Sequence, residues 1–261
     1  MSKPLALVTG ASSGIGAEMA RDLARRGHDL VLVARRESAL QQLADQLQRD
    51  HGVRCRVMSQ DLTDPAAVPA LVSGLQAQGL TPDVLVNNAG LGHIGHHARN
   101  DWADEQRMID LNITALTRLT HALLPAMKQR GRGRILNVAS TAAFQPGPGM
   151  AVYFASKAFV LHYSEALHQE LSGSGVTVTA LCPGPTESEF VQVASKSRRI
   201  SLADKVPFAP AASVARYGVA AMMRGQAVAV HGVANRLGTW SVRITPRWLM
   251  RRIIATVFKP V

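Results

Sequence analysis

A serine, a tyrosine and a lysine stand at spacings that could let them handle a proton together. Tyr153 and Lys157 are four residues apart, and Ser140 lies 13 residues before Tyr153. Residues four apart share one face of a helix, so the lysine ammonium can sit beside the phenol. A cation stabilises phenolate, so we expect Lys157 to lower the pKa of Tyr153 from about 10. Tyr153 could then serve as acid or base at an oxygen to which Ser140 donates a hydrogen bond.

A tyrosine and a lysine can also meet by chance on an exposed helix, so their surroundings matter. Ser140 ends the apolar stretch 135–140, which predicts a buried strand. In an open parallel sheet the ligand crevice lies beyond the carboxyl ends of the strands. We therefore expect Ser140 to face a bound ligand.

A glycine-rich turn near the start of the chain could bind phosphates. The buried strand expected at 5–8 runs into Thr-Gly-Ala-Ser-Ser-Gly-Ile-Gly, which ends at Gly16 and is followed by a helical pattern. Gly10 would allow the tight turn, Gly14 would let phosphates approach the backbone, and Gly16 would let the helix pack close to the strand. Free amides and the helix dipole favour an anion there. An ordinary tight loop is the alternative.

The residues after the second expected strand, 29–34, bear on the choice of dinucleotide. A carboxylate at this point binds the adenosine ribose and repels a 2′-phosphate, whereas arginine pairs with that phosphate. The chain has Arg35 and Arg36. We expect NADP(H) to be favoured over NAD(H), the alternative being that both arginines simply begin a solvated helix.

Other strand ends carry further candidates for dinucleotide contacts. Asp61 could hold the adenine amino group or be a turn residue. The amides of Asn87 and Asn88 could tie neighbouring strand ends together, with a plain turn as the alternative. Thr186 could bond a nicotinamide carboxamide or cap the next helix. The full set expected to bind the cofactor is Gly10, Ser12, Ser13, Gly14, Ile15, Gly16, Arg35, Arg36, Asp61, Leu62, Asn88, Ala89, Gly90, Tyr153, Lys157, Pro183, Gly184 and Thr186.

Two polar features fall outside the strand ends. Asn112 interrupts an apolar helical pattern over 102–128, which indicates a buried amide with a specific partner or a surface position one step round the helix. His93, His96 and His97 could bind a metal ion, but no nearby cysteine or acidic pair completes a ligand set. We expect no metal, and a loop that borders the substrate.

The order of elements predicts one α/β domain. Apolar stretches indicate strands that alternate with helical patterns, which is typical of a doubly wound parallel sheet. We read 187–210 as a substrate lid. The further strands are expected at 53–58, 84–87, 135–140, 176–182 and 227–230, and the further helices at 36–50, 102–128, 153–171, 213–224 and 245–258.

Composition suits a globular protein of a reducing compartment. The 261 residues are 47% hydrophobic and 18% charged, and no apolar run reaches the ~18 residues needed to cross a bilayer. Cys55 and Cys182 both fall in expected strands and imply no disulfide framework. We expect a cytoplasmic protein without nucleic-acid partners.

The net charge of +11 is concentrated at the C-terminus, where no acidic residue follows Asp204. The stretch 245–258 has an amphipathic pattern, with apolar rows at Leu249, Ile253 and Val257 and at Met250, Ile254 and Phe258. An apolar and basic helix suits an anionic membrane surface. Packing on the domain or on a second subunit is the alternative. We treat 1–235 as the catalytic domain and 236–261 as a basic extension packed on or beside it.

Taken in order, these motifs resemble the short-chain dehydrogenase/reductase family over about residues 3–232. The resemblance implies a Rossmann-type sheet of seven parallel strands and a homodimer or homotetramer. It also implies that Tyr153 is the acid/base, that Ser140 orients a carbonyl, that Lys157 binds the nicotinamide ribose, and that Asn112 positions a water next to Lys157. Ser13 departs from the family, since many members that prefer the phosphate carry a base there.

The expected activity is hydride transfer from NADPH to the carbonyl of a lipophilic ketone or a 3-oxoacyl substrate, reversibly oxidising a secondary alcohol. The alternative is a protein of the same fold that binds NADPH without turnover and acts in regulation or at a membrane surface.

Overall fold

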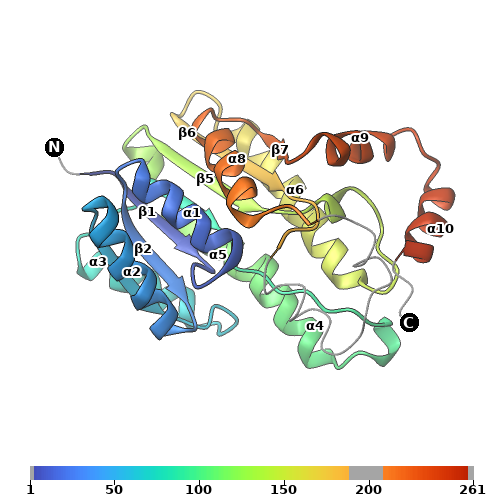
Figure 1. Cartoon of the computed structure of the whole chain (residues 1–261), viewed down its shortest axis with the longest axis horizontal. Coiled ribbons are helices and arrows are strands. Elements are labelled where there is room, and N and C mark those ends of the chain that lie inside the picture. Colours follow the sequence, from blue (N-terminus) through green and yellow to red (C-terminus); the bar gives the residue numbers. More distant parts are fainter. Residues whose placement is uncertain (1–2, 188–207, 258–261) are drawn as a thin grey trace.

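Seven parallel strands form one sheet in the order β3-β2-β1-β4-β5-β6-β7 (Figure 1). The computed structural model describes residues 3–187 and 208–257. The strand order reverses between β1 and β4, which is the switch point where doubly wound sheets bind ligands. The expected seven-stranded Rossmann-type fold is therefore confirmed. The strands are β1 (Leu5–Thr9), β2 (Asp29–Ala34), β3 (Cys55–Ser59), β4 (Val84–Asn87), β5 (Gly133–Val138), β6 (Val176–Cys182) and β7 (Val228–Val230).

Helices cover both faces of the sheet, so successive residues of β1 enter different cores. Ala6 and Val8 pack under the first set of helices, and Leu7 under the second. Burial on both faces is why the strands read as continuous apolar runs. The first set is α1 (Gly14–Arg25), α2 (Glu37–His51) and α8 (Ala211–Met223), and the second is α3 (Ala67–Ala77), α5 (Leu116–Gln129) and α6 (Ala151–Glu170).

The expected single helix over 102–128 is divided. It consists of α4 (Trp102–Ile109), a π-helical turn over Asp110–Ala115 and then α5. The wider turn carries Asn112, whose amide binds backbone outside the helix. Single π turns inside α-helices are frequent at functional sites. The apolar periodicity over 102–128 continues through the turn and therefore did not reveal it.

Two other element boundaries differ from expectation. Ser140 lies beyond β5, where it begins a short 3-10 turn over Thr141–Phe144. After β7, an unexpected helix α9 (Val233–Ser241) precedes α10 (Arg247–Val257). The expected border between residues 235 and 236 falls within α9. The division into 1–235 and 236–261 stays a prediction.

The expected substrate lid over 187–210 lies mostly outside the described residues, which resume at Phe208. In the part of the chain that is described, no helix has the length and apolar character needed to cross a membrane.

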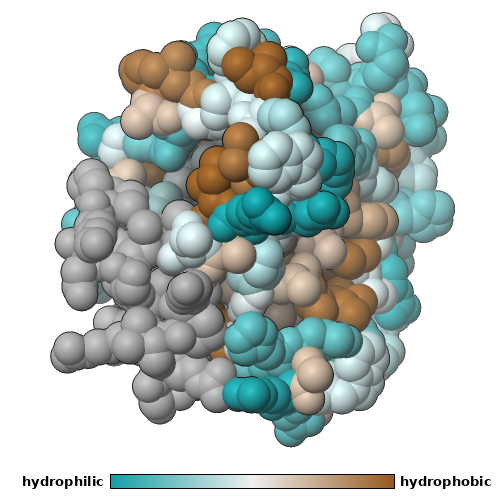
Figure 2. Space-filling model, turned by 90° about the vertical axis from the view of Figure 1, so that its right-hand side faces the viewer, coloured by the Kyte–Doolittle hydropathy of each residue, from teal (hydrophilic) through white to brown (hydrophobic). Residues whose placement is uncertain are grey.

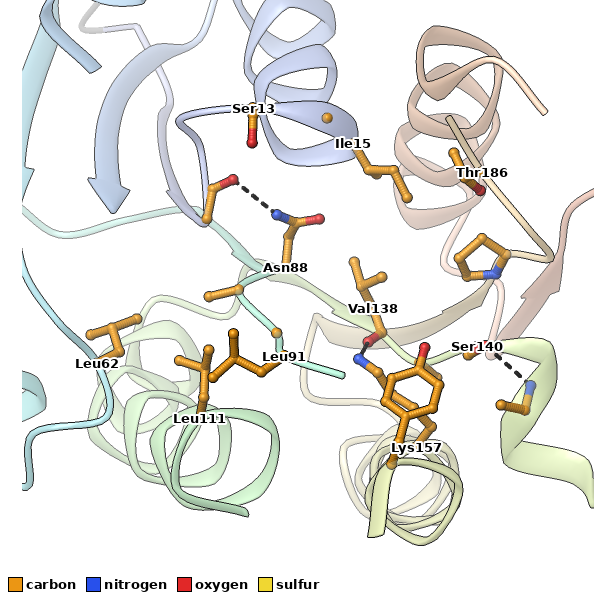
Figure 3. A pocket seen from close by; sticks show the side chains of 18 of the residues that line it. Ser13, Ile15, Leu62, Asn88, Leu91, Leu111, Val138, Ser140, Lys157 and Thr186 are labelled. Carbon is orange, nitrogen blue, oxygen red and sulfur yellow. Dashed lines mark hydrogen bonds between the residues drawn. The ribbon is translucent and has the colours of Figure 1, made fainter. Parts of the chain in front are cut away.

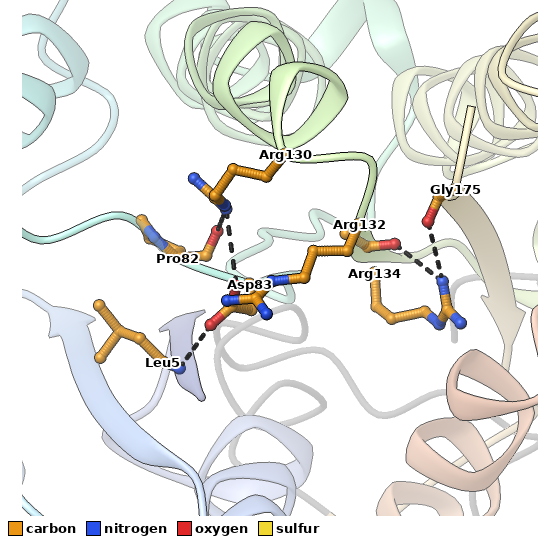
Figure 4. A network of polar contacts seen from close by, with 8 residues as sticks. Leu5, Pro82, Asp83, Arg130, Arg132, Arg134 and Gly175 are labelled. Atoms are coloured by element: carbon orange, nitrogen blue, oxygen red, sulfur yellow. Dashed lines mark hydrogen bonds and ion pairs between the residues drawn. The ribbon is translucent and has the colours of Figure 1, made fainter. Parts of the chain in front are cut away.

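A carboxylate ties three strands together at the edge of the sheet opposite their carboxyl ends (Figure 4). Asp83, just before β4, accepts a hydrogen bond from the Leu5 amide of β1 at 3.1 Å. It also accepts one from the Arg132 guanidinium at 3.2 Å, and its backbone carbonyl accepts from the Arg134 amide of β5 at 2.9 Å. These bonds set where β1, β4 and β5 begin relative to one another.

A second polar network lies inside the core between the sheet and two helices. The Asn87 amide of β4 donates to Asn137 Oδ1 of β5 at 2.9 Å and to Thr120 of α5 at 3.0 Å. Asn137 in turn donates to Ser164 of α6 at 2.9 Å. All four side chains are buried, so their partners replace water. The expectation that Asn87 ties neighbouring strand ends together is confirmed.

Asn137→Ala should lower the free energy of unfolding by about 1–3 kcal/mol, because it removes one of the two hydrogen bonds of the Asn87 amide and the bond that Ser164 accepts, while Thr120 and the Val160 carbonyl remain as partners. Urea denaturation measures the loss. Gln76→Ala on the exposed side of α3 is the control, with an expected change within about 0.5 kcal/mol. Equal stability of the two variants would contradict the inference that the network stabilises the core.

Candidate active site

One cavity of about 540 Å³ lies beyond the carboxyl ends of the central strands (Figure 3). The glycine turn, the end of β4 and the end of β5 all border it, so the strand order alone brings together segments far apart in the sequence. This is the crevice in which an open α/β sheet holds its ligand. The expected residues that line it are Gly10, Ser12, Ser13, Gly14, Ile15, Arg35, Arg36, Asp61, Leu62, Asn88, Ala89, Gly90, Ser140, Tyr153, Lys157, Pro183, Gly184 and Thr186.

The glycine turn is locked to the end of β4. The Asn88 side-chain amide donates to the carbonyls of Thr9 and Gly10 at 3.0 and 3.2 Å. The Thr9 hydroxyl accepts from the Asn88 and Ala89 amides at 3.0 and 3.1 Å. Thr9 is buried, and the sequence analysis did not predict this role for it. Its position at the strand end directly before Gly10 could have indicated a contact with the neighbouring strand.

Each glycine of the turn meets a different constraint. Gly10 has a φ of +65°, and a Cβ there would lie 2.7 Å from the Asn88 amide nitrogen. Gly16 does not line the cavity, and a Cβ there would collide with the Gly10 carbonyl. The turn therefore leaves a shallow backbone cradle at the start of α1. This geometry suits a dinucleotide pyrophosphate, as expected.

Two arginines border the cradle. Arg36 donates to Ser12 of the glycine turn at 3.3 Å, and Arg35 Nη1 lies 4.0 Å from an Asp61 carboxylate oxygen. Both line the cavity, although Arg36 also stands at the N-cap of α2. Guanidinium groups at this place suit a 2′-phosphate.

Asp61 lines the cavity, but its carboxylate accepts hydrogen bonds within its own turn. Its Oδ1 accepts from the Thr63 amide and hydroxyl at 3.1 and 2.8 Å. These bonds and Arg35 lower the pKa of the carboxyl against the opposing effect of desolvation, which is the largest of the causes. The turn interpretation of Asp61 is thus confirmed, and a contact to adenine stays a prediction.

Tyr153 and Ser140 meet at the far end of the cavity. Ser140 caps the 3-10 turn by accepting from the Ala142 amide at 3.1 Å, and it shares a hydrogen bond with the Tyr153 hydroxyl. Burial raises the pKa of Tyr153 to about 12, while the bond to Ser140 opposes that rise. A phenol of this kind stays protonated at neutral pH.

The expectation that Lys157 brings the pKa of Tyr153 below its usual value is wrong for this arrangement, because burial raises that pKa. The ammonium donates to the Val138 carbonyl at 2.8 Å and lies 5.9 Å from the centre of the Tyr153 ring. Burial lowers the pKa of Lys157 itself to about 8. At this distance from the ring, the attraction is smaller than the desolvation of the phenolate.

Asn112 acts on the backbone around the site. Its carboxamide accepts from the Leu91 amide at 2.8 Å and donates to the Leu91 carbonyl at 2.9 Å. It also donates to Ser156, whose hydroxyl donates to the Tyr153 carbonyl at 2.7 Å. Asn112 does not line the cavity, which leaves its water-positioning role a prediction. The sequence indicated a specific partner for Asn112, and that expectation is confirmed, but Ser156 was missed.

The end of the cavity next to Tyr153 is apolar. Ile94, Met150 and Phe154 line it and form one cluster with Met250 and Ile254 of α10. The cluster joins three distant parts of the chain, and no local pattern marked Ile94 or Met150 as its members. The second apolar row expected in 245–258 therefore packs on the domain at Met250 and Ile254.

The histidine-rich loop has acidic neighbours that were not predicted from the sequence. His97 Nδ1 lies 2.7 Å from a Glu105 oxygen, and His93 Nδ1 lies 3.9 Å from Asp104. Both carboxylates come from α4. Among the described residues, no three His, Cys, Asp or Glu side chains are grouped as a metal would require.

Known proteins resemble the chain in sequence and in fold. The family model for short chain dehydrogenases matches residues 4–199. A sulfoacetaldehyde reductase of Chromohalobacter salexigens is 41% identical over 191 residues, which cover 72% of this chain and 75% of that protein.

Two solved structures match almost the whole chain. A short-chain dehydrogenase from Sphingobium yanoikuyae, solved in complex with NADPH, is 37% identical with a TM-score of 0.82, and 95% of each chain is covered. A bulky-bulky ketone specific alcohol dehydrogenase from Comamonas testosteroni is 32% identical with a TM-score of 0.78, covering 94% of this chain and 93% of that one.

The chain belongs to the short-chain dehydrogenase family. It is accordingly an oxidoreductase with a dinucleotide site, as the ordered motifs indicated.

The buried ammonium of Lys157 should make stability depend on pH. Its pKa in the folded state, about 8, lies below the ordinary 10.5. Below pH 8 both states hold the proton. Between pH 8 and 10.5 the unfolded state holds more protons, so the free energy of unfolding rises with pH.

Lys157→Met removes this effect. The difference in free energy of unfolding between the original protein and the variant should shift by about 2 kcal/mol in favour of the original between pH 8 and 10. Urea denaturation across that range measures it. A constant difference would contradict the lowered pKa. Tyr153, whose pKa is raised, acts in the opposite sense only above about pH 10 and is present in both proteins.

Proposed function

We propose that the protein reduces the carbonyl group of a bulky, apolar ketone with NADPH, and that Tyr153 supplies the proton. The observation that carries this proposal is the meeting of Tyr153, Ser140 and Lys157 at the junction of the glycine-turn cavity and its apolar end. NADPH, when bound, would supply the hydride.

Four residues have distinct roles in the proposed proton transfer. Ser140 shares a hydrogen bond with the Tyr153 hydroxyl, so one carbonyl oxygen can accept from both groups. Tyr153 holds its proton at neutral pH and gives it to that oxygen. The positive charge of Lys157 and the hydroxyl of Ser140 then stabilise the phenolate. Asn112 is a positioning residue, because it reaches Tyr153 only through Ser156.

The lining of the cavity supports an apolar substrate over a small anionic one. Among the described residues that line it, the cations are Arg35, Arg36 and Lys157. The two arginines lie beside the glycine turn, and the ammonium of Lys157 is bonded to Val138. Among the described residues, the apolar end therefore has no guanidinium to pair with a sulfonate such as that of sulfoacetaldehyde. A bulky ketone or a 3-oxoacyl chain fits this lining better.

NADPH is the cofactor that the arginines favour. Arg36 bonds to Ser12 and Arg35 lies by Asp61, so both face the place where a 2′-phosphate would be held. The relative from Sphingobium yanoikuyae was solved with NADPH. Assembly into a homodimer or homotetramer and peripheral contact with a membrane stay predictions about partners.

Tyr153→Phe should lower the rate of ketone reduction by at least about a hundredfold while NADPH binding is retained, because only the proton donor is lost. NADPH oxidation is followed by absorbance with steroid, acyl-thioester and aromatic ketones, and binding by calorimetry. Tyr217→Phe on α8, away from the cavity, is the control and should stay active. Undiminished reduction by Tyr153→Phe would refute the role of the phenol.

If the original protein binds NADPH but reduces no ketone, and its biological effect survives Tyr153→Phe, the alternative of a regulatory NADPH-binding protein is correct.

Arg35→Asp should weaken NADPH binding by about tenfold to a hundredfold and NADH binding far less, because a charge-assisted bond to the 2′-phosphate is lost and a repulsion added. Calorimetric titration with each dinucleotide measures the two affinities. Arg49→Asp at the far end of α2 makes the same charge change and should alter neither. Equal losses of both affinities would exclude pairing with the phosphate.

A further inference from the structure

Helix α9 carries large apolar side chains on a surface that no described residue covers. None of its residues is buried. Val233, Leu237 and Trp240 are 72%, 64% and 60% exposed, and their spacing of four and three residues places them on one face of the helix. Ile244, 67% exposed, follows in the turn after the helix. Single exposed apolar residues are ordinary, but a row on one helix marks a contact surface.

The outer side of α10 extends this surface. Trp248, Leu249 and Ile253 are exposed, whereas Met250 and Ile254 face inward onto the apolar end of the cavity. Figure 1 shows α9 and α10 together at one end of the molecule, and Figure 2 shows apolar groups between hydrophilic ones at that end. We call the exposed apolar residues of α9, the turn and α10, with the arginines among them, the C-terminal surface.

The charge of the C-terminal surface has one sign. It carries Arg236, Arg243, Arg247, Arg251 and Arg252, and the sequence has no acidic residue after Asp204. In the described part of the chain, none of these five guanidinium groups forms a salt bridge. Arg252 lies over the ring of Trp248 at 5.5 Å, which leaves its charge in place. The partner must therefore supply both negative charge and apolar contact.

A second copy of the same surface does not meet this requirement. A two-fold interface sets equivalent patches against each other, so arginines would face arginines without a carboxylate between them. A bilayer with anionic lipids supplies phosphate groups to the arginines and an acyl region to Leu237 and Ile244. Tryptophan favours the boundary between these two regions, where its ring is apolar and its N–H is hydrated.

We propose that the C-terminal surface binds the surface of a bilayer that contains anionic lipids, with α9 lying in the plane of the interface. This goes beyond the expected basic helix at 245–258, because the inner row of α10 is engaged with the domain and α9 presents the more exposed row. The buried row of α10 packs on the cavity wall, so bound lipid would lie near the substrate end. That consequence alone rests on the proposed function.

The test measures binding of the full chain to sedimenting vesicles of phosphatidylcholine alone and of phosphatidylcholine with phosphatidylglycerol. The original protein should bind the anionic vesicles, and added salt should weaken binding. Trp240→Ser and Arg243→Glu should each weaken it by about tenfold or more, through lost apolar contact and reversed charge. Trp102→Ser on α4, also exposed, and Arg49→Glu on α2 make matched changes elsewhere and should bind as the original does.

Three results would overturn the proposal: failure of the original protein to sediment with anionic vesicles, equal losses in the matched controls, or dissociation of an oligomer by Trp240→Ser in light scattering. The last would assign the surface to a second copy of the chain. Circular dichroism and urea denaturation of the variants without vesicles check that the fold is intact. A failure of the proposed ketone reduction leaves the vesicle measurement unaffected, so the two ideas fail separately.

Discussion

The site is built around a charge held away from water. Lys157 is 5% exposed, and the hydrogen bond of its ammonium goes to the Val138 carbonyl at the end of β5. A buried cation is costly unless polar groups surround it. The neighbouring backbone keeps room for it: a Cβ at Gly90 would lie 3.4 Å from the ammonium and 3.3 Å from the Asn112 oxygen. Glycine at residue 90 and the π turn that carries Asn112 therefore belong to one arrangement.

Buried polar side chains extend this arrangement across the sheet. Thr9 and Asn88 join the glycine turn to β4, and Asn87 and Asn137 join β4 to β5 and to the helices beneath. Since each group is satisfied only in one register, these bonds set how far each strand reaches into the crevice. The cofactor cradle and the proton-handling residues are thereby held at a constant separation, as hydride and proton delivery to one carbonyl requires.

Helix α10 packs against the domain with one side and is exposed on the other. Met250 and Ile254 complete the apolar wall behind Phe154, while Trp248 and Arg251 on the same helix face outward. The residues that pack behind the cavity and those of the proposed binding surface therefore share one helix. A change on its outer side can reach the cavity through packing.

The sequence by itself determined the succession of strands and helices along the chain, the glycine turn, the pair Tyr153 and Lys157, and the arginines after β2. These features depend only on local spacing and residue chemistry. Tertiary structure alone decided that desolvation raises the pKa of Tyr153, that Asn112 holds Leu91, and that Met250 packs on residues lining the cavity while no residue of α9 is buried by the described part of the chain. Burial, the partner of a polar group and the side of a helix that is covered all depend on residues distant in sequence, which periodicity cannot place.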